Sequence, residues 1–93
     1  MTPRRVHLRI TGLVQGVSYR ANAQVLASRL GVRGWVRNLP NGDVESVAEG
    51  DPEPLERYIA WCRRGPSEAR VASVQVDELN ESVSLGHTFE VRR

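Results

Sequence analysis

A short segment with two glycines, Gly12 to Arg20 (GLVQGVSYR), contains residues suited to binding a phosphate-sized anion. Gly12 and Gly16 tolerate the dihedral angles that turn successive backbone N–H groups toward one point. Arg20 stands where a helix is expected to begin, and its planar guanidinium can donate two parallel hydrogen bonds to phosphate oxygens. On pattern alone, a tight turn beside a surface arginine is the commoner interpretation. The segment is therefore a candidate anion-binding loop, and the alternative stays open.

Asn38 is the second candidate, within Gly34 to Glu45 (GWVRNLPNGDVE). It lies near the end of an expected strand, and its amide can accept and donate hydrogen bonds at once, as positioning a water molecule requires. A bond to its own backbone at the following turn is the more frequent role of asparagine at such a place. In the same strand, Trp35 and Val36 should point to opposite faces, so that one packs and the other is half-exposed.

The composition excludes several other kinds of chemistry. All 13 cationic residues of the 93-residue chain are arginine, which leaves out Schiff-base chemistry, a lysine nucleophile and the lysine-containing phosphate loop. His7 and His87 lie far apart in sequence and fit an ordinary strand and loop, so there is no zinc-ligand spacing. The single cysteine, Cys62, cannot form an internal disulfide and has the spacing of a buried helix residue.

Charge and hydropathy restrict the partners and the location. With 13 basic and 11 acidic residues, the net charge of +2 is too weak to make nucleic acid or an anionic membrane the default partner. The sequence has no stretch suited to a signal peptide, and no window approaches the ~20 apolar residues of a membrane span. We therefore expect a single domain over residues 1–93 that is cytoplasmic, monomeric, and free of metal and cofactor.

Hydrophobic periodicity predicts the elements that must position these residues. Alternation of apolar and polar residues predicts a first strand over Arg5–Thr11, followed by the glycine loop. A helix is expected over Ala21–Leu30, with Gly31 as its C-terminal cap. Its apolar stripe is expected to consist of Val25, Leu26 and Leu30 together with the small residues Ala23 and Ala27.

A hairpin, a second helix and two further strands follow. Strands are expected over Val32–Leu39 and Val44–Ala48, because an Asn-Gly pair between two apolar runs is the strongest short hairpin signal. Asp51 and Pro52 suit the start of a helix that Gly65 ends. The other expected features are a buried helix face of Leu55, Tyr58, Ile59 and Cys62, a strand with Val71, Val74 and Val76, a polar loop from Asn80 to Gly86, and a short strand with Phe89 and Val91. The order βαββαβ indicates an α+β, ferredoxin-like fold in which two helices cover one face of an antiparallel sheet.

The glycine segment and the hairpin segment together resemble the two signature motifs of the acylphosphatase family. The family forms are G-x-V-Q-G-V-x-[FY]-R and G-[FYW]-[AV]-x-N-x-x-[DN]-G-x-V, and both are complete here, over residues 12–20 and 34–44. The resemblance extends over essentially the whole chain, including the later stretches PSEARVASVQV and TFEVR. It implies hydrolysis of small acyl phosphates to a carboxylate and inorganic phosphate, with no need for a metal.

Carried over by position, the resemblance implies a role for each motif. Arg20 would bind the phosphoryl oxygens together with the backbone N–H groups of the preceding residues, which are Gln15, Gly16, Val17, Ser18 and Tyr19. Asn38 would orient the attacking water, and no covalent intermediate is needed. Many members have Arg at the position of Leu13 and an aromatic residue at that of Ser18, so these two departures bear on substrate preference.

Two other functions compete with acyl phosphate hydrolysis. A non-catalytic relative would bind an acyl or carbamoyl phosphate for a larger machinery, as the acylphosphatase-like domain of larger carbamoylation proteins does. A ferredoxin-like RNA-binding module would present stacking aromatic side chains on its central strands, and the chain has one Phe, two Tyr and two Trp with no RNP-like run. Hydrolysis of a small acyl phosphate is the preferred hypothesis, with inorganic phosphate as product and inhibitor.

Overall fold

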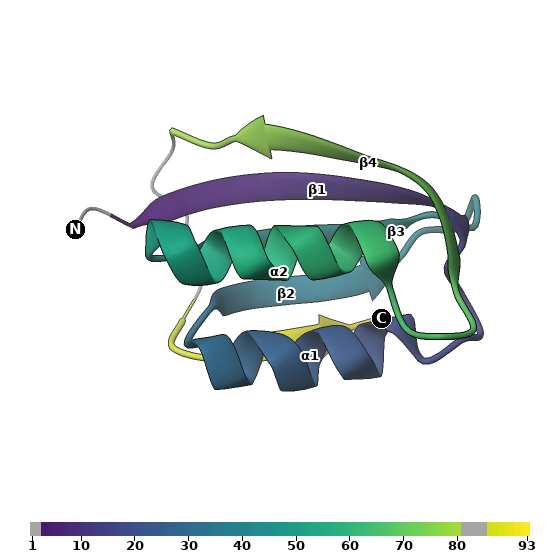
Figure 1. Ribbon diagram of the computed structural model, residues 1–93, viewed down its shortest axis with the longest axis horizontal. Coiled ribbons are helices and arrows are strands. Elements are labelled where there is room, and N and C mark those ends of the chain that lie inside the picture. The colour runs from purple at the N-terminus through teal and green to yellow at the C-terminus, as the bar shows by residue number, and fades with distance from the viewer. Residues whose placement is uncertain (1–2, 81–85) are drawn as a thin grey trace.

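The chain folds into five strands and two helices in a computed structural model that describes residues 3–80 and 86–93 (Figure 1). The elements are β1 (Arg4–Leu13), α1 (Tyr19–Leu30), β2 (Arg33–Asn38), β3 (Val44–Gly50), α2 (Pro52–Arg64), β4 (Arg70–Glu78) and β5 (Phe89–Arg92). Every predicted helix and strand is present, with boundaries that shift by a few residues. Most of the predicted loop from Asn80 to Gly86 lies outside the described residues.

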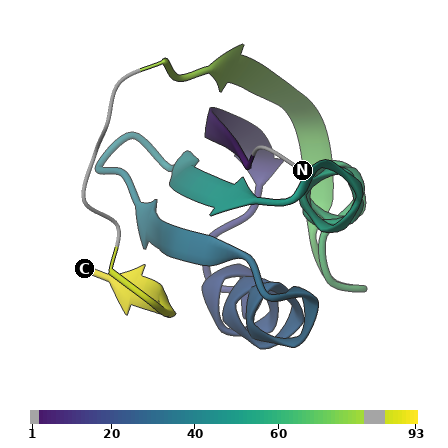
Figure 2. The same ribbon diagram turned by 90° about the vertical axis from the view of Figure 1, so that its left-hand side faces the viewer.

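The sheet has the order β4-β1-β3-β2-β5, and both helices lie on one of its faces (Figure 2). Helix α1 contacts β2 and β5, whereas α2 contacts β1, β3 and β4. This confirms the predicted α+β, ferredoxin-like arrangement. Among the described residues, no helix is both long and apolar enough to span a membrane.

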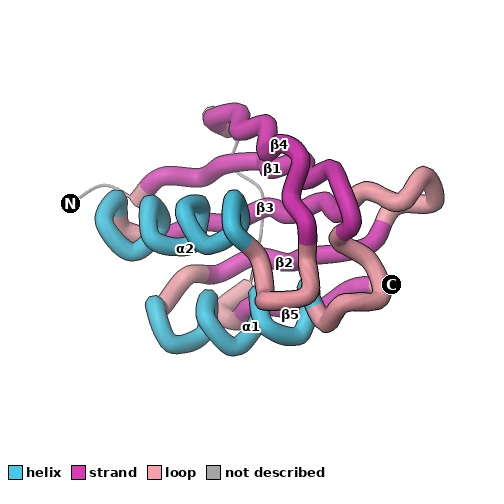
Figure 3. Tube along the Cα trace, turned by 45° about the vertical axis from the view of Figure 1, so that its right-hand side comes forward, coloured by secondary structure: helices cyan, strands magenta, loops and turns pink. Residues whose placement is uncertain are grey.

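One strand pairing differs from the predicted antiparallel sheet. Strand β5 pairs parallel with β2, while the pairs of β1 with β3, β1 with β4 and β2 with β3 are antiparallel. The direction follows from the chain path, because β4 ends at the side of the sheet where β2 begins, and β5 starts again from that side. As a result, the ends of β2 and β5 lie together at one side of the molecule, next to the loop between β1 and α1 (Figure 3).

The buried face of α1 also differs from the predicted stripe. Tyr19, Ala23 and Ala27 are its buried residues, whereas the side chain of Val25 is 51% exposed. The helix begins at Tyr19, two residues before the predicted start, and this large aromatic residue takes the first position of the buried face. The small alanines allow the helix backbone to approach the sheet closely, so the helix packs through Ala23 and Ala27 and leaves its larger Val25 in solvent.

The other predicted packing positions are confirmed. Val36 is fully buried and Trp35 is half-buried on the opposite face of β2, where the guanidinium groups of Arg37 and Arg92 lie over its ring at 5.2 and 5.0 Å. The buried residues of α2 are the four predicted ones, Leu55, Tyr58, Ile59 and Cys62. The core therefore lies between the two helices and the covered face of the sheet.

Candidate functional site

The predicted anion-binding loop is shorter than its sequence motif. Strand β1 continues through Gly12 to Leu13, with a shift in register between Thr11 and Gly12 where β1 pairs with β4. Gly12 has a φ of 121°, and a Cβ there would lie 2.2 Å from the carbonyl oxygen of Arg70. This glycine therefore serves strand pairing, and the loop itself comprises residues 14–18.

The loop presents backbone N–H groups without partners. The N–H groups of Gly16, Val17 and Ser18 donate no hydrogen bond to any described residue. Ser18 has a φ of 62°, a left-handed conformation that is uncommon outside glycine, and it turns the chain directly into α1. The first turn of α1 contains no acidic residue, so no carboxylate competes with an anion for its N–H groups.

Gln15 anchors this loop to the hairpin that follows β2. Its side-chain Nε2 donates hydrogen bonds of 2.8 Å to the carbonyl oxygens of both Leu39 and Asp43. The same hairpin is closed by the N–H of Leu39, which donates to the carbonyl oxygen of Asp43 at 2.8 Å. The Gln15 side chain thus joins the loop to the hairpin at the end of β2, the strand that carries Asn38.

Replacing Gln15 with Ala is expected to lower the free energy of unfolding by about 1–3 kcal/mol, because two hydrogen bonds to half-buried carbonyl oxygens are lost. Urea denaturation measures this change. Gln75→Ala is the matched control, because Gln75 is exposed and, within residues 3–80 and 86–93, its amide bonds Asp77 alone, at 3.4 Å. Equal stability of the two variants would show that the Gln15 contacts contribute nothing to holding the loop.

Arg20 occupies the second position of α1, and its guanidinium lies between the loop and β5. Its Nη1 donates a hydrogen bond of 3.0 Å to the carbonyl oxygen of Arg92. One turn further along α1, Gln24 Nε2 donates to the carbonyl oxygen of Phe89 at 3.1 Å. These two contacts hold the end of β5 beside the first turns of α1.

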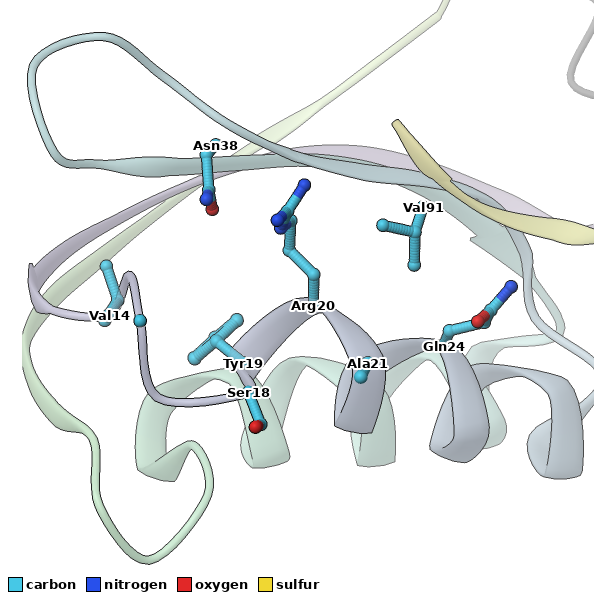
Figure 4. A pocket seen from close by; sticks show the side chains of 9 residues that line it. Val14, Ser18, Tyr19, Arg20, Ala21, Gln24, Asn38 and Val91 are labelled. Atoms are coloured by element: carbon cyan, nitrogen blue, oxygen red, sulfur yellow. The ribbon is translucent and has the colours of Figure 1, made fainter. Parts of the chain in front are cut away.

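Arg20 and Asn38 meet at one pocket of about 250 Å³. Asn38 is the last residue of β2, and its amide and the guanidinium of Arg20 lie next to each other in the pocket (Figure 4). The residues that line it are Val14, Gly16, Ser18, Tyr19, Arg20, Ala21, Gln24, Asn38 and Val91. The two motifs of the sequence, 18 residues apart at Arg20 and Asn38, therefore contribute to one site.

The predicted site residues differ in how they relate to this pocket. Gly16, Ser18, Tyr19, Arg20 and Asn38 line it, whereas Gln15 and Val17 are not among its lining residues. The side chain of Val17 packs against the core, so any contribution to the pocket comes from its N–H group. Leu13 is 54% exposed and also stands outside the lining.

Four lining residues, Val14, Ala21, Gln24 and Val91, were not among the predicted site residues. The helical spacing of four residues from Arg20 to Gln24 is the signal that indicates a shared helix face. Val91 carries no such signal, because its place depends on β5 pairing beside β2.

Glu45 reinforces the strands that carry Asn38. One of its carboxylate oxygens accepts a hydrogen bond from Arg37 Nε at 2.6 Å. The other is hydrogen-bonded to His7 Nε2 at 2.7 Å. Burial raises the pKa of the Glu45 carboxyl, but the hydrogen bonds from His7 and Arg37 outweigh burial and leave the pKa below its usual value. His7, predicted as an ordinary strand residue, therefore supports β1, β3 and β2 through this carboxylate.

Tyr19 and Cys62 have structural roles in the hydrophobic core. The Tyr19 O–H donates to the carbonyl oxygen of Cys62 at 2.8 Å, and its ring lies 5.0 Å from that of Trp61. The Cys62 thiol is fully buried, and burial raises its pKa to about 12, so it remains protonated at neutral pH. This confirms the predicted buried position and excludes the thiol as a nucleophile at neutral pH.

The chain is similar to acylphosphatases in both sequence and structure. The family model described as Acylphosphatase matches residues 6–91. An acylphosphatase of Methylococcus capsulatus is 58% identical over 76 residues, which are 82% of this chain and 83% of the relative. The structure of an acylphosphatase from Coxiella burnetii has a TM-score of 0.89 at 36% identity and covers 97% of this chain and 93% of that chain. The crystal structure of acylphosphatase from Bacillus subtilis has a TM-score of 0.90 at 29% identity, with coverages of 97% and 99%.

Proposed function

The chain belongs to the acylphosphatase family and is an enzyme that hydrolyses acyl phosphates, and we propose that Arg20 and Asn38 carry the reaction in the pocket between the loop and β2. Arg20 and the N–H groups of the loop would hold the phosphoryl group. Asn38 would hold the attacking water. The observation that carries this assignment is that the N–H groups of Gly16, Val17 and Ser18, beside the Arg20 guanidinium, have no partner among the described residues.

In this proposal, all the groups that bind the phosphoryl group are N–H hydrogen-bond donors. The three equatorial oxygens accept hydrogen bonds from the loop N–H groups and from the two-pronged guanidinium of Arg20. These donors are fixed before substrate arrives, because Gln15 holds the loop and the carbonyl oxygen of Arg92 holds Arg20. Fixed donors stabilise the charge that develops on the oxygens in the transition state without reorganising.

The hydrolysis step requires one water molecule. Its oxygen forms a bond to phosphorus while the bond between phosphorus and the acyl oxygen breaks, and the electron pair of that bond leaves with the carboxylate. A carboxylate is a good leaving group, so no general acid is needed. Asn38 accepts a hydrogen bond from the water and orients its lone pair, and the water proton passes to a phosphoryl oxygen.

The described residues that line the pocket include no His, Asp or Glu that could act as a base beside Asn38, and this proton transfer needs none. The pocket lining includes one formally charged residue, Arg20, among the nine described residues that form it. The charge stabilisation that a metal supplies in other phosphoryl transfer sites would come here from Arg20 and the loop. We expect inorganic phosphate, the product, to occupy the same donors and inhibit the enzyme.

Hydrolysis of benzoyl phosphate in the presence of EDTA tests this proposal. We expect turnover that EDTA leaves unchanged and that inorganic phosphate inhibits competitively. If the protein does not hydrolyse benzoyl phosphate but phosphate protects it from thermal unfolding, the protein binds phosphate without activity. If EDTA abolished activity and added divalent metal restored it, the proposal that Arg20 and the loop N–H groups supply the charge stabilisation would be contradicted.

A further inference from the structure

We infer that the acyl end of the substrate lies against Val91 of β5, and that the pocket selects short, uncharged acyl groups. The inference rests on the proposed function, because it takes the loop as the phosphoryl site and Asn38 as the residue that holds water. It concerns the half of the pocket that neither motif supplies, which is lined by Ala21, Gln24 and Val91.

The direction of the acyl group follows from the geometry of phosphoryl transfer. The attacking and leaving oxygens lie roughly in line on opposite sides of phosphorus. In the pocket, Asn38 and Val91 lie on opposite sides of the Arg20 guanidinium (Figure 4). Water approaches phosphorus from Asn38, so the carboxylate leaves on the side away from Asn38. The part of the pocket beyond Arg20 is lined by Gln24 and Val91, and we place the acyl group there (Figure 4).

Val91 presents an apolar surface at that place. It stands opposite Val36 in the parallel pair of β5 and β2, and it shares a face of β5 with Phe89, which is 3% exposed. Val91 itself is 39% exposed, and its isopropyl group points into the pocket (Figure 4). An apolar acyl chain in contact with it removes apolar surface from water.

The width of this half of the pocket is set by two hydrogen bonds. Arg20 and Gln24, one helical turn apart on α1, bond the carbonyl oxygens of Arg92 and Phe89, on either side of Val91. Strand β5 is thereby tied to α1 two residues before Val91 and one residue after it. The gap between Val91 and α1 is fixed by these contacts, so the bound acyl group must fit the space that exists.

The charge and size of the pocket restrict the acyl group further. Arg20 is the sole formally charged member of the nine described lining residues, and its guanidinium is used by the phosphoryl group. A carboxylate at the far end of the acyl chain would lie beside Val91, where it loses hydration without gaining a cation. The volume of about 250 Å³ is below the range typical of sites for drug-sized ligands, which favours short chains.

Butyryl phosphate and succinyl phosphate test the wild-type enzyme as a matched pair. Both have four-carbon acyl chains. Succinyl phosphate ends in a carboxylate where butyryl phosphate ends in a methyl group. We expect kcat/KM to be about 10-fold or more higher for butyryl phosphate. Equal values would overturn the preference for uncharged groups, and hydrolysis of neither compound nor of acetyl phosphate would overturn the proposed function itself.

Val91→Arg tests whether this residue contacts the acyl group. The new cation is expected to raise the ratio of kcat/KM for succinyl phosphate to that for butyryl phosphate by about 5-fold or more. Effects on phosphoryl binding cancel in this ratio. Val25→Arg is the matched control, because Val25 is an exposed valine of α1 outside the pocket and its replacement changes the net charge equally.

A ratio that stays at the wild-type value in Val91→Arg, or that rises equally in Val25→Arg, would place the acyl group elsewhere while leaving the proposed function intact. Thermal unfolding shows whether each variant is folded. If Val91→Arg is not folded, Val91→Thr replaces it, because threonine preserves the shape and strand preference of valine. That variant is expected to lower kcat/KM for butyryl relative to acetyl phosphate by about 3-fold, and an unchanged ratio would contradict the inference.

Discussion

Arg20→Lys is expected to lower kcat/KM for benzoyl phosphate by about 100-fold or more, although the positive charge is retained. An ammonium group is a point charge and cannot reproduce two parallel hydrogen bonds to phosphoryl oxygens. It also cannot bond the carbonyl oxygen of Arg92 and a phosphoryl oxygen in the geometry of the guanidinium. Arg20→Ala removes the charge as well, and a fall on the order of 1,000-fold is expected. Steady-state kinetics with both variants measures these losses.

Arg29→Lys is the control for Arg20→Lys. Arg29 lies in the last turn of α1, is exposed and does not line the pocket, so the variant has the same change of residue on the same helix. We expect its kcat/KM to equal that of the wild type. If Arg20→Lys retained kcat/KM near the wild-type value, Arg20 would be a surface arginine beside a tight turn, as its sequence pattern alone allows.

Asn38→Ala is expected to lower kcat by about 100-fold while the inhibition constant of inorganic phosphate remains unchanged. The two effects separate because the phosphoryl donors lie in the loop and in α1, whereas Asn38 lies on β2. Removing the amide leaves the phosphate site complete but deprives the water of the group that orients it. Initial rates at saturating benzoyl phosphate, with and without phosphate, measure both quantities.

The control for this variant is Asn80→Ala, because Asn80 is exposed and does not line the pocket. Its kcat is expected to equal that of the wild type. Weaker inhibition by phosphate in Asn38→Ala would identify Asn38 as part of the phosphate site. A lowered melting temperature would identify it as a residue that stabilises the hairpin, the alternative that the sequence leaves open.

The residues proposed for the phosphate end of the site could be predicted because they are close together in sequence. Gly16, Ser18 and Arg20 lie within five residues, and their arrangement follows from the local turn into α1. Asn38 was predictable as a strand end because the Asn-Gly turn places the hairpin. The predicted stripe of α1 was wrong at Val25, since helical periodicity allows more than one face and the close packing of Ala23 and Ala27 selects among them.

The acyl half of the pocket was not predictable in this way, because it depends on contacts between distant residues. Arg20 and Arg92 are 72 residues apart, and Gln24 and Phe89 are 65 apart. Their proximity requires β5 to pair parallel with β2, which contradicts the predicted antiparallel sheet. Gln15 is a similar case, since its side chain bonds carbonyl oxygens 24 and 28 residues away.

The sequence by itself thus determined the order of elements, the family and the two residues proposed for catalysis, because each follows from a local pattern of residue types. Only the tertiary structure decided what surrounds them. It placed β5 at the sheet edge beside β2, Val91 in the pocket across from Asn38, and the Gln15 amide in the hairpin. The physical reason is that a local pattern sets dihedral angles and one buried face, whereas strand pairing and side-chain hydrogen bonds join segments whose distance apart no local pattern records.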